Sequence, residues 1–247
     1  MRLAILSDIH GNLHALEAVW QDLEPQRPDA VYCLGDLVGY GGFPNEVVAF
    51  VREHWIPTVL GNYDEGVGFD MHDCGCAYRT AAERSRGDAS LQWSRAHTSP
   101  DHKAYLRSLV PNIRIEESRP TLLLVHGSPR KVNEYVYEDR PEATFQRLAA
   151  LAGTDVLLFG HTHLPYVKRV GRTLFVNAGS VGKPRGGDPR AVYALVDLGR
   201  VPTVEFRRVA YDALAAAEAV RMAGLPPAFA DLLLSGGVEP AEEGANA

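Results

Sequence analysis

A chain of 247 residues with 46% hydrophobic and 23% charged residues has the composition of a globular protein with a large core, and no segment reads as a linker. Its net charge of -6, without a Lys/Arg block, argues against electrostatic binding to nucleic acid or to an anionic membrane. Three cysteines are too few for a disulfide-stapled secreted domain, and the apolar run in residues 1–8 is too short for a signal peptide or membrane span. We therefore expect a cytoplasmic protein.

The first sixty residues alternate short apolar runs with helical periodicity. RLAIL (2–6), AVYCL (30–34) and PTVL (57–60) read as strands, and segments 12–23 and 44–54 read as helices. This β-α-β-α-β order is typical of parallel strands with helices packed on the sheet. In the first helix an apolar stripe includes Leu16, Val19 and Leu23, and Asn12 is placed to cap its start.

Residues 66–109 change in character and predict a helical insertion between strands. The remaining segments predict, in chain order, strands at 112–117 and 121–126, a helix at 141–153, a strand at 155–160, antiparallel hairpins over 165–209 with Gly171 in one turn, and a helix at 211–224. The acidic tail at 236–247 is expected to fray. We expect one domain over residues 1–247, with the C-terminal helix and tail following about residue 210.

Polar side chains follow several of the predicted strands at the point where each strand ends. Because the carboxyl ends of strands in an open α/β sheet face one crevice, we expect these side chains to share a site. They supply only nitrogen and oxygen donors, a set suited to borderline or hard divalent ions. Each motif taken alone could equally be a helix cap, a turn or a structural histidine. The seven residues are Asp8, His10, Asp36, Asn62, His126, His161 and His163.

The motifs DIH, GD, GNYD, HGS and GHTH, in this order, resemble those of the calcineurin-like metallophosphoesterases from residue 3 to about residue 210. The resemblance implies an α/β fold in which two mixed β-sheets pack face to face and are flanked by helices. It also implies two divalent metal ions, and manganese, iron, zinc and nickel all tolerate such ligands. The ligands it implies form two groups bridged by Asp36: Asp8, His10 and His163 for one ion, and Asn62, His126 and His161 for the other.

Two dications about 3.5 to 4 Å apart clamp a phosphoryl group and lower the pKa of a shared water. The resemblance therefore implies hydrolysis of phosphodiesters or activated phosphomonoesters by a metal-bridging hydroxide. Gly61 is expected to allow a turn before the ligand Asn62. Tyr63 replaces a histidine that acts as a general acid in many members, and a phenol with a pKa of about 10 is a slow proton donor. Asp64 is expected to support the site from behind the ligands.

Two further segments are candidates for a part in the site. The stretch NAGSVGKPR (177–185) resembles the family's NPGS segment, with Ala178 in place of proline, so Asn177, Ser180 and Arg185 are candidate phosphate contacts; an ordinary hairpin turn is the alternative. Cys74 and Cys76 read either as a thiol reaching the metal centre or as a small-residue turn with inert thiols, and their spacing favours the turn.

Three functions remain open at this level. The first is a phosphoesterase acting on a small phosphate ester, possibly a nucleotide. The second keeps the chemistry but acts on dinucleoside polyphosphates or phosphoproteins. The third is a non-catalytic, metal-binding interaction scaffold like a retromer subunit, which degraded metal ligands would support. All seven ligand positions are filled, which favours an enzyme, and the sequence leaves the oligomeric state open.

Overall fold

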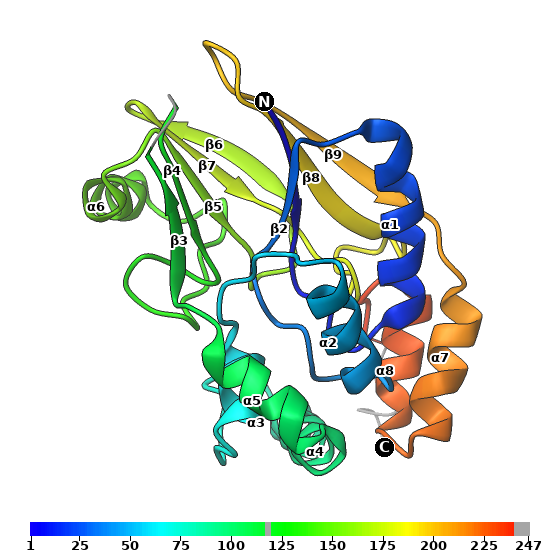
Figure 1. Ribbon diagram of the computed structural model, residues 1–247. Helices are drawn as coiled ribbons and strands as arrows, with labels where there is room; N and C mark the ends of the chain where they lie inside the picture. The colour runs from blue at the N-terminus through cyan, green and yellow to red at the C-terminus, as the bar shows by residue number, and fades with distance from the viewer. Residues whose placement is uncertain (117–119, 240–247) are drawn as a thin grey trace.

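The computed structural model describes residues 1–116 and 120–239. Within this part of the chain two β-sheets lie face to face (Figure 1). One sheet has the strand order β2 (Ala30–Cys33), β1 (Arg2–Leu6), β8 (Ala191–Asp197), β9 (Thr203–Val209). The other has the order β3 (Asn112–Ile115), β4 (Leu122–Val125), β5 (Val156–Phe159), β7 (Thr173–Asn177), β6 (Tyr166–Val170).

Both sheets are mixed, as the resemblance implied. β1 pairs in parallel with β2 and antiparallel with β8, while β4, β5 and β7 run parallel between the antiparallel edge strands β3 and β6. The interpretation of residues 57–60 as a strand is wrong. This segment makes only single bridges, Thr58 with Cys33 and Val59 with Val110, because it is short and a helix begins directly after Gly61.

The alternation of side chains along the strands builds the core between the sheets. In β1, Leu3 and Ile5 face the opposite sheet, where they pack with side chains such as Val156 and Leu158 of β5. The other face of β1 carries Ala4 and Leu6 toward the outer helices. A strand buried on both faces reads as a continuous apolar run, which explains the uniform sequences of β1, β4 and β5.

Helices cover the outer face of each sheet (Figure 1). On the first sheet lie α1 (Leu13–Gln26) and α2 (Pro44–Glu53), and Asn12 caps α1 by accepting a hydrogen bond from the Ala15 amide at 3.1 Å. On the second sheet α6 (Glu142–Ala152) buries Phe145 and Leu148. The resulting order is helix, sheet, sheet, helix, as expected for this fold class.

In the sequence, three helices lie between α2 and β3: α3 (Asn62–Gly68), α4 (Ala81–His97) and α5 (Pro100–Ser108). Helix α3 starts at Asn62, so the residues that follow Gly61 form the first turn of a helix. After residue 210 the structure has two helices where one was predicted, α7 (Ala213–Met222) and α8 (Pro227–Leu234). Most of the predicted frayed tail, residues 240–247, lies outside the described residues, whereas Gly236 accepts a hydrogen bond from the Gly187 amide at 2.9 Å.

None of the helices within residues 1–116 and 120–239 combines the length and apolarity that crossing a bilayer requires.

Candidate metal centre

The loops that leave the carboxyl ends of β1, β2, β4 and β5 meet at one edge of the two sheets and bring six of the seven predicted side chains together, and the seventh, Asn62, joins them from the start of α3. Asp8 and His10 follow β1, and Asp36 follows β2. Backbone hydrogen bonds tie these two loops, from the Asp8 amide to the Gly35 carbonyl at 3.0 Å and from the His10 amide to the Asp36 carbonyl at 2.9 Å. His126 follows β4, and His161 and His163 follow β5.

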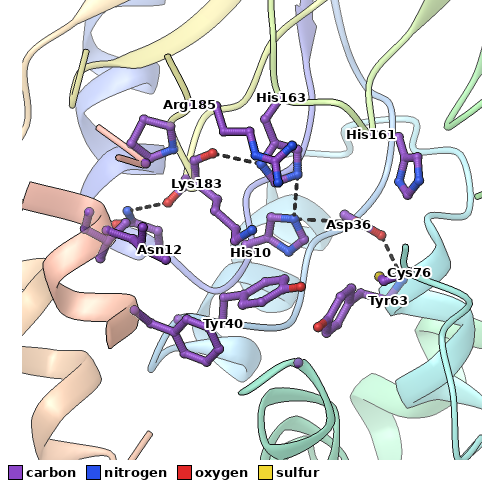
Figure 2. A pocket seen from close by; sticks show the side chains of 18 of the residues that line it. His10, Asn12, Asp36, Tyr40, Tyr63, Cys76, His161, His163, Lys183 and Arg185 are labelled. Atoms are coloured by element: carbon purple, nitrogen blue, oxygen red, sulfur yellow. Dashed lines mark hydrogen bonds and ion pairs between the residues drawn. The ribbon is translucent and has the colours of Figure 1, made fainter. Parts of the chain in front are cut away.

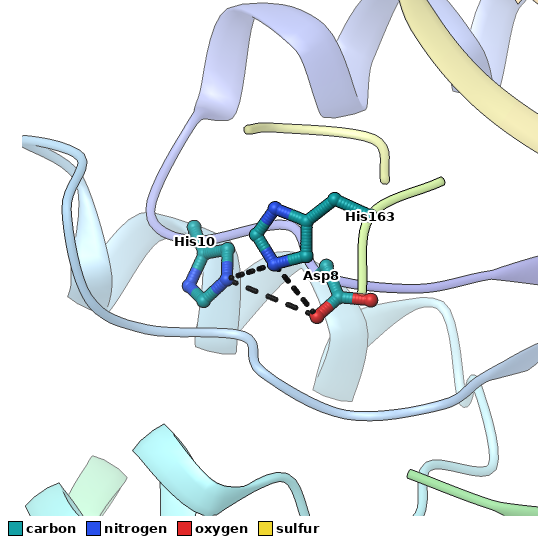
Figure 3. A group of neighbouring side chains, drawn as sticks. All are labelled: Asp8, His10 and His163. Atoms are coloured by element: carbon teal, nitrogen blue, oxygen red, sulfur yellow. Dashed lines mark hydrogen bonds and ion pairs between the residues drawn. The ribbon is translucent and has the colours of Figure 1, made fainter. Parts of the chain in front are cut away.

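Asp8, His10 and His163 form the first cluster (Figure 3). Nε2 of His10 and Nε2 of His163 lie 3.2 Å apart, and His163 Nε2 lies 3.2 Å from Asp8 Oδ1. The second oxygen of Asp8 is occupied, because it accepts hydrogen bonds from Ser7 Oγ at 2.5 Å and from the His161 amide at 3.0 Å. One carboxylate oxygen is thus fixed by the protein and the other is presented to the cluster.

Asp36, His126 and His161 form the second cluster, with Asn62 beside it. His126 Nε2 lies 3.2 Å from His161 Nδ1 and 3.1 Å from Asn62 Oδ1. The amide of Asn62 is oriented by its nitrogen, which donates to the Cys74 carbonyl at 3.1 Å. This bond turns the amide oxygen toward the histidines, as a neutral oxygen ligand would have to be placed.

Asp36 lies between the two clusters. Its Oδ2 is 3.6 Å from His10 Nε2 in the first cluster and 3.4 Å from His126 Nε2 in the second. Its Oδ1 accepts a hydrogen bond from the Tyr63 amide at 2.8 Å, which fixes the carboxylate plane. The carboxylate that the resemblance placed in a bridging position therefore has the geometry to contact ligands of both groups.

The histidine rings are oriented by backbone carbonyls. A carbonyl can only accept, so each Nδ1 that faces one must carry a proton, and a ring that carries no second proton presents a bare Nε2 to the site. The three pairs are His10 with Val38 at 3.0 Å, His126 with Leu34 at 2.7 Å, and His163 with Lys183 at 2.8 Å.

Five of the seven residues sit in the left-handed backbone region, which non-glycine residues rarely occupy. Such a conformation costs roughly 1 kcal/mol or more per residue and persists only where the surrounding structure holds it. Nine non-glycine residues in the described ranges have positive φ, so the strain is concentrated at this site. The five are Asp8 (φ 53°), His10 (51°), Asp36 (57°), His161 (65°) and His163 (63°).

The chemistry of this donor set fits divalent cations. Asp8 Oδ1 and His161 Nε2 are buried and have no hydrogen-bond partner among the described residues, and the facing lone pairs of His10 and His163 repel each other unless a positive charge lies between them. Burial lowers the pKa of His10 and of His161 to about 3, which keeps both rings neutral. Burial also opposes the charged form of His126, but Asp36 outweighs it and raises that pKa to about 10.

Gly61 and Asp64 support Asp36 from behind. The backbone at Gly61 is extended (φ -86°), so the turn expected there is a wrong explanation of this glycine. Its absent side chain matters instead, because a Cβ would lie 2.2 Å from both the amide nitrogen and Oδ1 of Asp36. Asp64 accepts hydrogen bonds from the amides of Asp36 (2.8 Å), Leu37 (2.8 Å) and Gly61 (3.1 Å), and burial with the nearby Asp36 raises its pKa to about 7. Asp64 is therefore a positioning residue that does not line the cavity.

A cavity of about 610 Å³ opens in front of the two clusters (Figure 2). Its walls include Tyr63, as predicted, and residues that the sequence did not single out: Tyr40, Tyr135 and Lys183. The far wall comes from α7 and α8. Their approach depends on tertiary packing, and no motif in their sequence signals it.

The structure corrects the predicted substrate contacts. Asn177 and Ser180 are buried and line no part of the cavity. Asn177 donates to the Gly160 carbonyl at 2.8 Å, and Ser180 donates to the Asp8 carbonyl at 2.8 Å, so both hold the ligand-bearing loops. Arg185 does line the cavity. The segment is a loop that braces the site and presents its basic end to the cavity.

Cys76 reaches the site, as the interpretation of a thiol reaching the metal centre predicted, while the reactivity of this thiol stays a prediction. Its Sγ accepts a hydrogen bond from Asn62 Nδ2 at 3.2 Å, lies 3.2 Å from Cys74 Sγ, and lines the cavity.

Comparisons with known proteins agree with this geometry. Residues 1–200 match the family model of the calcineurin-like phosphoesterase superfamily domain. An uncharacterized protein of Methanocaldococcus jannaschii is 30% identical over 95% of this chain and 98% of its own length, and phosphodiesterase YfcE of Escherichia coli K12 is 30% identical over 80% of this chain and 88% of its own.

Solved structures show the same relationship. A metallophosphoesterase from Sphaerobacter thermophilus matches with a TM-score of 0.76 at 33% identity, covering 96% of this chain and all of its own. A hypothetical protein from Pyrococcus horikoshii has the same fold, with a TM-score of 0.84 at 21% identity over 97% of this chain and 99% of its own. The chain therefore belongs to the calcineurin-like phosphoesterase superfamily, whose members are metal-dependent phosphoesterases.

Proposed function

We propose that the protein hydrolyses phosphodiesters and activated phosphomonoesters with two divalent cations. Asp8, His10 and His163 hold one cation in this proposal, Asn62, His126 and His161 hold the other, and Asp36 contacts both. The observation that carries the proposal is the position of Asp36 Oδ2, 3.6 Å from a ligand of one cluster and 3.4 Å from a ligand of the other. When bound, the two cations would supply an activated water as nucleophile and positive charge for the phosphoryl oxygens. Imidazole, carboxylate and amide ligands suit manganese, iron, zinc or nickel.

The chain's own groups prepare the site for this chemistry. Hydrogen bonds hold the Asp8 and Asp36 carboxylates and the Asn62 amide in one orientation each, so little reorganisation is needed when a phosphate enters. Burial raises the pKa of Tyr63, so this phenol keeps its proton and is no efficient donor to a departing alkoxide. These features favour esters whose leaving groups depart without protonation.

A test of the two-cation assignment compares single-ligand variants. Chelation should abolish hydrolysis of bis(4-nitrophenyl) phosphate, and added manganese should restore it at least in part. Asp36→Asn should lower bound metal, measured by elemental analysis, below the level of His10→Ala, because it weakens both cations together. Hydrolysis that survives exhaustive chelation, or near-normal metal content and rate in Asp36→Asn, would contradict the mechanism.

The alternatives give different results in the same experiments. A hydrolase of dinucleoside polyphosphates or phosphoproteins would need the same metal but would prefer those substrates in a panel with simple diesters. An interaction scaffold would bind metal and hydrolyse none of them. The intact donor set and the cavity in front of it support an enzyme acting on a small phosphate ester such as a nucleotide.

A further inference from the structure

Two basic side chains on one loop face the cavity beside the first cluster. Lys183 and Arg185 both line it, and Figure 2 shows them next to His10 and His163. Lys183 Nζ lies 4.1 Å from the centre of the Tyr40 ring. Within residues 1–116 and 120–239 neither side chain forms an ion pair with a carboxylate, whereas other basic side chains do, for example Arg52 with Asp101 and Lys103 with Asp70. A half-buried ammonium ion without a counter-ion is costly unless a ligand supplies the charge.

The loop that carries these two residues is held rigidly against the candidate metal ligands. The Lys183 amide donates to Ser180 Oγ at 2.8 Å, and its carbonyl accepts from His163 Nδ1 at 2.8 Å. Gly182 donates to the Asp8 carbonyl at 3.0 Å, and a Cβ at this glycine would lie 1.7 Å from the Ile9 carbonyl oxygen. On its other side Gly237 packs so closely that a Cβ there would lie 3.0 Å from the Arg185 Cα. The backbone of the loop is thus fixed before any ligand arrives, and it carries both basic side chains at the cavity.

Charge balance indicates what these residues bind. Two divalent cations held by the carboxylates of Asp8 and Asp36 leave two positive charges, which the single charge of a diester and a deprotonated water together balance. Lys183 and Arg185 add two positive charges that a simple diester leaves unmatched. Apart from Asp36, the other charged side chains that line the cavity do not cancel them, because three are positive and two are negative: Arg79, Arg86, Arg140, Glu83 and Glu239. A second anionic group on the substrate, such as a terminal phosphate dianion, would match them.

We infer that Lys183 and Arg185 form an anion subsite that selects phosphodiesters carrying a second phosphate group over diesters with a single charge. The inference rests on the proposed function, since it names the substrate class of the same site. Charge-assisted hydrogen bonds from a lysine and an arginine to one phosphate would supply the selectivity, and the cavity of about 610 Å³ has room for a substrate of nucleotide size.

A matched pair of chromogenic substrates tests whether Lys183 and Arg185 select a second phosphate group. Thymidine 5′-(4-nitrophenyl phosphate) carries one charge, and the same compound with a 3′-phosphate adds only the second anion; both release 4-nitrophenol. The manganese-loaded wild type should show a kcat/KM at least about tenfold higher for the 3′-phosphorylated compound. Lys183→Met and Arg185→Gln, which keep much of the side-chain length, should each reduce this ratio, and the double variant should bring it close to one.

Controls separate the outcomes. Lys131→Ala removes an exposed lysine outside the cavity and should keep the wild-type ratio. Thymidine 3′,5′-bisphosphate should inhibit the wild type more strongly than thymidine 5′-monophosphate, and this difference should shrink in 0.5 M salt, where charges are screened over about 4 Å. Hydrolysis of both substrates with equal kcat/KM, or an unchanged ratio in the double variant with a wild-type melting temperature, would overturn the anion subsite alone. No hydrolysis of either substrate would overturn the proposed function and the subsite with it.

Discussion

Tyr63 lies where many members of the family that the sequence resembles have a histidine. Its ring lies 5.5 Å from the His10 ring and 4.7 Å from the Tyr40 ring, and its hydroxyl is buried at the edge of the cavity. A histidine at this position would donate a proton near neutral pH, whereas burial raises the pKa of the phenol even further from that range. With tyrosine in place of histidine, we therefore expect kcat/KM to depend on the pKa of the leaving group.

We expect the wild-type kcat/KM to fall steeply as the pKa of the leaving group rises across a series of aryl and alkyl phosphodiesters. General acid catalysis contributes roughly 10²- to 10⁴-fold, so its absence should be measurable. Tyr63→His should raise the rate for poor leaving groups more than for good ones, and Tyr63→Phe should change both little. A shallow dependence in the wild type together with a large loss in Tyr63→Phe would instead identify tyrosine as the acid.

Cys74 and Cys76 predict a response to thiol oxidants. Their Sγ atoms are 3.2 Å apart, so modest side-chain rotation would bring them to the bonding distance of about 2.05 Å. Diamide, which takes up the two thiol hydrogens, should convert this pair to a disulfide while Cys33, buried in β2 with its pKa raised by burial, stays reduced. Because Asn62 donates to Cys76 Sγ, phosphodiesterase activity should fall and dithiothreitol should restore it.

Peptide mass analysis identifies which cysteines react with diamide. Cys76→Ser cannot form the bond, and its activity should not respond to diamide. Equal reactivity of Cys33, or full activity in the oxidised protein, would show that the pair has no influence on the site.

At the scale of elements, hydrophobic periodicity predicted those helices and strands whose buried residues recur at helical or strand spacing. The stripe of α1 and the apolar runs of β1, β4 and β5 are confirmed, because α1 packs its stripe on one core and each of these strands is buried on both faces. Residues 57–60 and α3 were misassigned for a physical reason. The chain meets the edge strand β2 only at its last residue, Cys33, and then enters a helix whose first turn is held by Asp64 and Asp36. Such contacts across the molecule leave no local signal.

An ion pair between elements predicts how stability depends on pH. Asp22 on α1 accepts a hydrogen bond from Arg207 Nη2 of β9 at 2.9 Å and from the Tyr193 hydroxyl of β8 at 2.7 Å. The hydrogen bond from Arg207 lowers the pKa of Asp22. A depressed carboxyl pKa gives stability that is present above the unfolded value of about 3.9 and is lost as the pH falls through the lower, folded value.

Asp22→Asn should therefore lower the free energy of unfolding at pH 7 by about 1 kcal/mol, since the pair is partly exposed. The difference from wild type should begin to narrow below about pH 4, where the carboxyl of the unfolded wild type binds a proton, and should close once the pH passes the lower pKa of the folded state. Urea unfolding at several pH values measures the loss at pH 7 and its decrease at low pH. Glu17→Gln, an exposed change on the same helix, should have no such effect, and a difference that is constant down to pH 2 would contradict the assignment.

At the scale of the whole molecule, the site is a product of topology. The motifs predicted the two clusters because parallel strands bring their carboxyl ends to one edge, and this rule holds without knowledge of the loops. Their role as ligands remains a prediction. The wall formed by α7 and α8 could not be predicted, because it depends on where the C-terminal helices pack. Lys183 lies in the segment from which Arg185 was predicted, but only the bond between its carbonyl and His163 shows that it stands beside the first cluster.

This topology makes metal binding a property of the whole fold. The two clusters join loops from both sheets, and without cations they hold buried carboxylates and histidine lone pairs close together. Cations that bind only the folded chain stabilise it by mass action, by about 2.7 kcal/mol at a concentration one hundred times the dissociation constant. For a chain of this length that corresponds to a rise in melting temperature of roughly 5 to 10 °C.

Calorimetry of the chelated protein with and without manganese should show this rise, and it requires no substrate. Asp36→Asn should lose most of this rise in melting temperature, because the Asp36 carboxylate contacts both clusters. His163→Ala should retain the part of the rise that comes from metal bound at the second cluster. Asp22→Asn should start from a lower melting temperature but gain the full increment, since its ion pair lies away from the metal centre. Equal increments in the wild type and Asp36→Asn would place the bound metal elsewhere on the molecule, and a melting temperature that manganese leaves unchanged would show that these loops fold without the ion they are arranged to hold.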